Sequence, residues 1–197
     1  MATVSQGVGT RDVARAAIRQ ELSRVAFDLF VRKGFDEVTI ADVAAAAGVS
    51  RSTFQRYFAT KEDAVTDAIA AQCPAIVAAL RARPTGEDDW TALRRAMDVI
   101  VDPHRADPAG VLERSRLIQT TPALRVGTTE KRAGWAPALV AALADRGSEE
   151  RSPMILAVRV AAALDIVTIA IEHWTAAEGR IDISSLLDEG FSALRSA

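Results

Sequence analysis

The sequence is poor in the residue types that stabilise disulfide-rich or β-rich folds. It contains one cysteine, Cys73, which excludes an internal disulfide and is typical of a protein of the reducing cytoplasm. Aromatic residues make up 5% of the 197 residues, and alanine is abundant. This composition favours helices over sheets. No segment has strand-like alternation or an internal repeat, so we expect an all-α fold.

Membrane-spanning runs and enzyme signatures are also lacking. The most apolar stretch, residues 153–171, contains Arg159 and Asp165, whose charges are costly inside a bilayer. Residues 1–10 have no apolar centre of the kind found in a signal peptide. The two histidines, His104 and His173, have no cysteine or carboxylate at metal-ligand spacing, and nucleotide-binding glycine motifs and a nucleophile elbow are missing. We therefore expect no catalytic residues, no cofactor, no metal and no membrane partner.

The charge is unevenly distributed, although the formal net charge of the chain is only −2. Residues 11–61 carry nine basic and six acidic side chains, which gives a net charge of +3. The remainder carries fifteen basic and twenty acidic side chains, a net charge of −5. A basic head on an acidic body is the asymmetry expected when only one end approaches phosphate.

Residues 39–61 form the most informative stretch and indicate two short helices joined by a tight turn. Thr39 is in position to cap the first helix, with Asp42 three residues later as in a capping box. Gly48 provides a helix stop, and Ser50 caps the second helix, over residues 51–58. This order predicts a helix-turn-helix, whose second helix enters a DNA major groove.

The second helix has one apolar and one polar face. Phe54 and Phe58 are four residues apart and point inward, whereas Arg51, Ser52, Gln55 and Arg56 remain on the outer face. Lys61 stands near the start of the following helix, where the helix dipole disfavours a cation, so its presence there suggests either a DNA phosphate partner or a tolerated surface lysine.

The run A47-G48-V49-S50-x-x-T53-F54-x-x-Y57-F58-x-x-K61-E62 resembles the DNA-binding domain of TetR-type transcriptional regulators. The upstream run G34-F35-x-x-V38-T39-I40-x-D42-V43-A44 resembles it too. Gln55 departs from the family pattern, which often has a phosphate-contacting tyrosine there, so this chain is expected to differ in operator preference. The resemblance implies phosphate contacts from Thr39, Ser50, Tyr57 and Lys61. Candidates for base-edge contacts are Arg51, Ser52, Thr53, Gln55 and Arg56, and a phosphate contact is equally open to Arg56.

The order of elements predicts a disordered arm (1–10), a helix-turn-helix domain (11–60) and a helical ligand-binding and dimerisation domain (61–197). Arg11, Arg15 and Arg19 lie on one face of the first helix, either near a DNA backbone or simply in solvent. We expect about nine helices, with a break at Pro74, a loop at 102–108 and an interrupted helix from 122. Their ranges are 11–33, 40–47, 51–58, 61–80, 90–101, 109–119, 122–146, 153–177 and 185–194.

The helix over 153–177 is apolar nearly all round and must be buried on every side. It is either a core helix of one chain or, together with the last helix, part of a four-helix dimer interface as the TetR resemblance implies. The residues assigned to that interface are Leu164, Val167, Ile171, Trp174, Leu187 and Phe191.

A ligand site is expected among apolar residues of the body helices, which would otherwise be plain core. The apolar candidates are Trp90, Leu93, Met97, Leu117, Ile118, Trp135 and Leu139, and Arg114 is a charged candidate beside them. The stretch from Arg114 to Arg125 resembles an actinobacterial TetR subgroup thought to bind acyl-CoA-like ligands. An apolar cavity edged by arginines suits an acyl chain with an anionic end. Asp165 and His173 either contact a polar ligand group or form a core or dimer-interface pair.

The sequence thus predicts a homodimeric, bacterial, cytoplasmic repressor that binds a palindromic operator and is released by a small apolar or amphipathic effector. Two alternatives remain: a helical ligand-binding protein without DNA-binding activity, and a structural DNA-binding protein without an effector.

Overall fold

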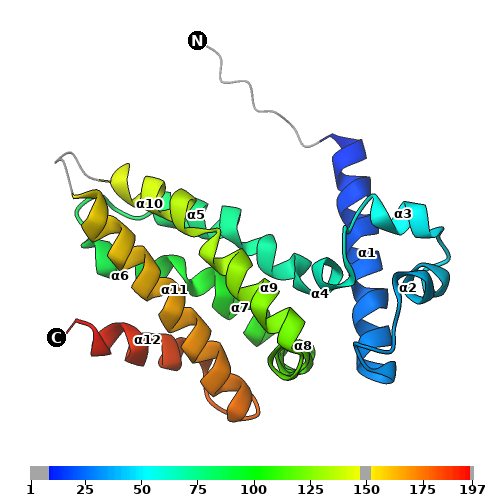
Figure 1. Cartoon of the computed structure of the whole chain (residues 1–197). Helices are drawn as coiled ribbons and strands as arrows, with labels where there is room; N and C mark the ends of the chain where they lie inside the picture. The colour runs from blue at the N-terminus through cyan, green and yellow to red at the C-terminus, as the bar shows by residue number, and fades with distance from the viewer. Residues whose placement is uncertain (1–8, 147–151, 196–197) are drawn as a thin grey trace. The chain divides into compact units, whose positions relative to one another are not determined.

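The computed structural model describes residues 9–146 and 152–195, and within these ranges the chain forms only helices and turns (Figure 1). The predicted all-α class is therefore confirmed. The helices are α1 (Thr10–Lys33), α2 (Ile40–Ala46), α3 (Arg51–Gln55), α4 (Lys61–Ala70), α5 (Gln72–Arg81), α6 (Asp89–Ala96), α7 (Asp98–Ala106), α8 (Pro108–Thr120), α9 (Pro122–Ala133), α10 (Ala136–Ala144), α11 (Pro153–Ala176) and α12 (Ile183–Ala193). The predicted arm, residues 1–10, lies almost wholly outside the described residues.

Three of the expected helices are each divided in two. When α4–α5, α6–α7 and α9–α10 are each taken as one helix, the described segments correspond to the nine expected ones. The first break lies at Ala71 and not at Pro74. Pro74 instead falls in the first turn of α5. Backbone N–H groups in a first turn make no hydrogen bond within the helix, so a proline there removes none.

The prediction of a loop at 102–108 is wrong. α7 continues to Ala106 with Pro103 inside it, and only Asp107 separates it from α8. Asp107 caps α8, since its Oδ1 accepts a hydrogen bond from the Gly110 N–H at 3.0 Å. Pro103 removes one helical hydrogen bond, and burial of Ile100, Val101 and His104 on the same helix offsets that loss.

The chain divides into two compact units, residues 1–67 and 68–197, with the boundary inside α4. The first unit has a small aromatic core. The rings of Phe30 and Phe35 lie 4.9 Å apart, and those of Phe54 and Phe58 lie 5.4 Å apart. Phe54 and Phe58 are fully buried, so one face of the second helix of the helix-turn-helix packs inside its own unit.

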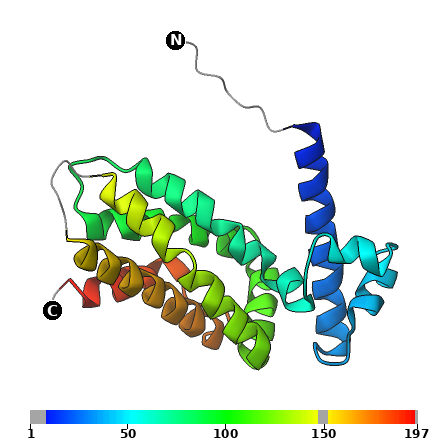
Figure 2. The same ribbon diagram turned by 45° about the horizontal axis from the view of Figure 1, so that its top comes forward.

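The second unit is built around α11, which packs against α12, α10, α8, α6 and α9 (Figures 1 and 2). Its buried side includes Val160, Ala163, Val167 and Trp174. By length and composition alone, Lys61–Arg81 and Pro153–Ala176 would be long enough to cross a membrane, a property that core helices share. The extensive packing of α11 accounts for much of its apolar composition.

Candidate DNA-binding surface and ligand cavity

The helix-turn-helix is held by local hydrogen bonds that the sequence predicts. The Asp42 N–H donates to Thr39 Oγ1 at 3.2 Å, and the Thr39 N–H donates to Asp42 Oδ2 at 2.9 Å, which confirms the capping box. The hydrogen bonds from Thr39 hold the pKa of the Asp42 carboxyl below its ordinary value. Gly48, with φ of +69°, makes the turn in a conformation that a side chain would strain.

α3 presents a polar, basic surface to solvent. Ser50 caps it by accepting a hydrogen bond from the Thr53 N–H at 3.0 Å. The helix is shorter than expected and ends at Gln55, but Phe54 and Phe58 are both buried as predicted. The opposite side is open: Arg51, Ser52, Gln55 and Arg56 are exposed, and Thr53 and Tyr57 are half-buried.

Lys61 has a structural role that the sequence does not reveal. Its ammonium donates to the carbonyl oxygens of Phe35 and Val38 at 2.7 and 3.1 Å and lies 4.4 Å from the centre of the Phe35 ring. These bonds use two of its three N–H groups. Lys61 therefore fixes the segment between α1 and α2, whatever else it contacts.

Arg19 also stabilises the first unit. Its Nε donates to Asp67 Oδ1 at 2.7 Å and its Nη1 donates to the Tyr57 carbonyl at 2.6 Å. The guanidinium lies over the Phe58 ring, 4.5 Å from its centre. Arg19 is therefore not simply a solvated side chain. It joins α1 to the end of the α3 region and to α4.

The second unit contains a cavity of about 480 Å³ whose walls come from α4, α5, α7, α8, α9 and α11. Two of the eight predicted ligand residues, Arg114 and Ile118, line it. The others do not. Leu93, Met97, Trp135 and Leu139 are buried in the core, Leu117 is half-buried outside the lining, and the Trp90 indole N–H donates to the Phe191 carbonyl at 2.8 Å.

His104 is buried in the cavity wall with one unpaired nitrogen. Its Nδ1 lies 2.7 Å from the Ile100 carbonyl, and its ring meets Trp174 edge-on with the centroids 4.6 Å apart. Burial lowers the pKa of His104, and the nearby charge of Arg132 lowers it further, although the bond to Ile100 opposes the shift. His104 is therefore neutral at pH 7, and its Nε2 has no hydrogen-bond partner.

Two further unpaired polar atoms lie on α9. Arg132 donates through Nη1 to Thr168 Oγ1 at 3.3 Å, but its buried Nε has no partner. Loss of solvation lowers the pKa of Arg132 to about 10, against the opposing charge of Glu172, so the guanidinium stays cationic at pH 7. Thr128, one helical turn before Arg132, is also buried and its hydroxyl has no partner.

The sequence does not single out these three residues. Thr128 and Arg132 have the spacing of neighbours on one helix face, but a threonine and an arginine four residues apart are common on solvated helices. His104 has no cysteine or carboxylate at metal-ligand spacing in the sequence, and among the described residues no cluster suitable for a metal ion is found.

The residues predicted to form the dimer interface mostly face inward. Leu164, Val167, Trp174, Leu187 and Phe191 are buried within one chain, and Ile171 is half-buried. Within one chain they are therefore core residues of the second unit. The periodicity of a helix that is apolar all round does not distinguish its inner from its outer face.

A different set of residues makes an exposed apolar face on α11 and α12. A groove of about 440 Å³ runs along it, with Asp165, His173 and Glu189 as its charged or titratable members. Its apolar lining includes Ala162, Ile169, Leu186, Ala193 and Leu194. Met154, Ile155 and Val158 extend the exposed apolar surface of α11. We call the groove and these three residues the α11–α12 face.

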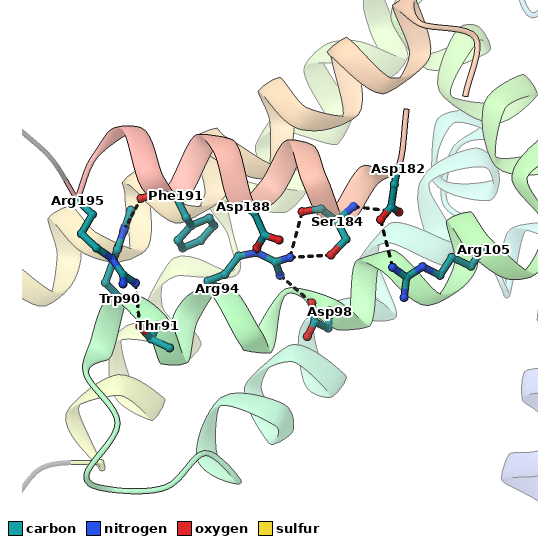
Figure 3. A network of polar contacts seen from close by, with 10 residues as sticks. All are labelled: Trp90, Thr91, Arg94, Asp98, Arg105, Asp182, Ser184, Asp188, Phe191 and Arg195. Carbon is teal, nitrogen blue, oxygen red and sulfur yellow. Dashed lines mark hydrogen bonds and ion pairs between the residues drawn. The ribbon is translucent and has the colours of Figure 1, made fainter. Parts of the chain in front are cut away.

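α12 is fastened to α6 and α7 by polar contacts (Figure 3). The buried guanidinium of Arg94 donates to Asp188 at 2.6 Å, to Asp98 at 2.7 Å, and to the hydroxyl and carbonyl of Ser184 at 2.9 and 3.1 Å. At the other end of α12, the ring of Phe191 lies 4.6 Å from that of Trp90. Contacts with α6, which is itself bonded to α7 through Arg94 and Asp98, therefore hold α12 in position.

Two family models match the chain. One, described as bacterial regulatory proteins of the tetR family, covers residues 22–68, and the other, described as the MftR C-terminal domain, covers residues 87–197. The transcriptional regulator TcmR of Streptomyces glaucescens is 33% identical over 124 residues, 60% of this chain. The match spans only about half, 55%, of TcmR itself.

A second relative and a solved structure match over most of the chain. The MftR regulator of Mycobacterium tuberculosis, named for mycofactocin biosynthesis, is 26% identical over 91% of this chain and 90% of its own length. The structure of FadR from Thermus thermophilus in complex with lauroyl-CoA has a TM-score of 0.55 and 22% identity, covering 89% of this chain and 92% of that one. That likeness shows the same fold.

Proposed function

The chain belongs to the TetR family of bacterial regulatory proteins and is a transcriptional regulator, and we propose the following mode of action. It is a cytoplasmic repressor that binds a palindromic operator as a homodimer, and a small apolar or amphipathic effector releases it. The observation that carries the proposal is the combination of an exposed polar face on α3 with a half-apolar cavity in the second unit.

DNA binding rests on α3. Arg51 and Gln55 are exposed on a helix that is anchored by its opposite side, so they are free to meet base edges in a major groove. Arginine pairs with guanine and glutamine with adenine through two hydrogen bonds each. The test compares Gln55→Ala with wild type on one operator and its single-base variants. A relaxed preference at one or two positions supports base contact, whereas an unchanged preference contradicts it.

Dimerisation rests on the α11–α12 face. Exposed apolar side chains on two neighbouring helices, continuous with a groove, are the kind of surface that a second copy of the chain buries. A two-fold axis through this face gives two recognition helices and therefore a palindromic operator with half-sites about one DNA turn apart. Asp165 and His173 line the groove and belong to this interface in the proposal.

The dimer is tested by placing a charge on the face. Ile169→Asp is expected to give monomers in sedimentation at concentrations where wild type is dimeric, because an aspartate at the interface loses its solvation. Val126→Asp is the matched control. Val126 lies on α9 with the same degree of exposure, 57% against 53% for Ile169, but outside the groove. Equal effects of the two variants would contradict the proposed interface.

The effector is proposed to bind in the cavity of the second unit. Its volume of about 480 Å³ is within the range of small-molecule sites, and Arg114 and Arg125 are among its lining residues. The FadR structure with lauroyl-CoA supports an acyl-CoA-like effector for a protein of this fold. α4 begins at Lys61, and Ala68 and Ile69 at its far end contribute to the cavity wall, so ligand contacts act directly on that helix.

Release is tested by adding lauroyl-CoA to the protein–operator complex. A ligand shifts the equilibrium only by its difference in affinity between the two states, so dissociation should follow the ligand concentration. Coenzyme A without the acyl chain is the control. The alternative is a ligand-binding protein without DNA-binding activity. It predicts that the chain binds lauroyl-CoA but does not bind the operator, with or without the ligand.

A further inference from the structure

The cavity wall holds three buried polar atoms without hydrogen-bond partners: His104 Nε2, Thr128 Oγ1 and Arg132 Nε. His104 is 8% exposed and Thr128 is 3% exposed. Buried polar groups in folded proteins are nearly always paired, so three unpaired ones in a single cavity are unusual. Their common location indicates that a bound molecule completes them.

The three atoms belong to one patch. Thr128 and Arg132 are neighbours on one face of α9. The charge of Arg132 is close enough to depress the pKa of His104 on α7. Arg132 is held by its bond to Thr168 of α11, so the patch lies where three helices meet.

The hydrogen-bonding character of each atom follows from its other contacts. A backbone carbonyl only accepts, so His104 Nδ1 carries the proton that it donates to Ile100, and the neutral ring leaves Nε2 as an acceptor. Arg132 Nε is a donor only, and the Thr128 hydroxyl is both. The complementary molecule must therefore offer one donor, one acceptor with partial or full negative charge, and one group of either kind.

We propose that the effector carries a hydroxyl group and a carbonyl or carboxylate oxygen within a few bonds of each other, and that these groups bind this patch. The hydroxyl donates to His104 Nε2, the carbonyl or carboxylate accepts from Arg132 Nε, and Thr128 bonds to either oxygen. This inference rests on the effector site proposed above and narrows its ligand to an oxygenated amphipathic acid or carbonyl compound.

A fatty acid without the hydroxyl, in the same position, offers its carboxylate to Arg132 Nε and the Thr128 hydroxyl but leaves His104 Nε2 without a donor. A site built around buried polar groups discriminates strongly against an analogue that lacks the matching group, because the desolvated protein atoms then remain unpaired. We therefore expect roughly tenfold or more between otherwise identical ligands with and without the hydroxyl.

The test compares two probes that differ by one hydroxyl, 3-hydroxydodecanoate and dodecanoate, titrated calorimetrically into the full chain. Wild type is expected to bind the hydroxy acid at least about tenfold more tightly. His104→Phe keeps an aromatic ring against Trp174 but has no acceptor, so it should remove this preference, and the two acids should then bind with equal affinity. Arg132→Met should weaken both acids. The exposed Arg95 lies outside the cavity lining, and Arg95→Met should change neither affinity.

Three results would overturn the inference: equal affinity of wild type for the two acids, a preference that survives in His104→Phe, or no binding of either acid up to about 1 mM. Operator binding and its release by lauroyl-CoA are measured separately. If lauroyl-CoA releases the operator but the chain does not discriminate between the two acids, the inference about the patch is contradicted and the proposed regulatory function is not. If the chain discriminates between the two acids but binds no operator, the inference about the patch stands and the proposed regulatory function is contradicted.

Discussion

Replacement of Arg94 by methionine tests whether polar contacts hold α12 in place. The guanidinium is only 8% exposed in its side chain and makes four hydrogen bonds, two of them to carboxylates (Figure 3). Methionine retains the buried stem and removes every bond. Hydrogen bonds to charged groups contribute about 1.5–3 kcal/mol each. That sum overstates the loss, because Asp98 and Asp188 are 48% and 65% exposed and regain water when the arginine is removed.

We therefore expect Arg94→Met to lower the free energy of unfolding by about 2–3 kcal/mol. For a chain of this length, the melting temperature should fall by roughly 4–12 °C. The assay is thermal unfolding followed by circular dichroism, with Arg95→Met as the control on the exposed side of the same helix. The variant should also dimerise more weakly, since α12 carries part of the α11–α12 face. Equal melting temperatures for the two variants would refute the reasoning.

Two further predictions concern Lys61 and His104. Lys61→Met should destabilise the first unit by about 1–2 kcal/mol, because the carbonyls of Phe35 and Val38 lose their donor; unchanged stability would leave Lys61 with a DNA role only. His104 has a pKa lowered by burial, so below its ordinary value of about 6.5 the unfolded chain takes up a proton that the folded chain does not. Wild type should therefore lose up to about 1 kcal/mol between pH 7.5 and 5.5 in chemical denaturation, and His104→Phe should not; parallel losses would contradict a depressed pKa.

The helix-turn-helix was predictable because the signals that form it are local. The capping pair of Thr39 and Asp42, the cap at Ser50 and the inward spacing of Phe54 and Phe58 each act within four residues. Sequence alone therefore placed the exposed face of α3. It did not reveal the second role of Lys61, whose carbonyl partners lie 23 and 26 residues away.

In the second unit the order of the helices was predictable, whereas their breaks and the residues on their surfaces were not. α11 is apolar on every side, and only packing against its neighbours determines that Val167 is buried while Ile169, two residues later, is exposed. The same applies to the cavity. Leu93 and Met97 are as apolar as any lining residue, yet they lie in the core. The polar patch joins α7 to α9, and its members are not adjacent in the sequence.

The most direct test of the account is a selection of random duplex DNA by the purified full chain, followed by sequencing. The account predicts strong enrichment of a palindrome whose half-sites are centred about one helical turn apart. It also predicts that Gln55→Ala changes the enriched bases and that Ile169→Asp abolishes the two-fold symmetry. No enrichment from a chain verified as folded and dimeric would contradict the account.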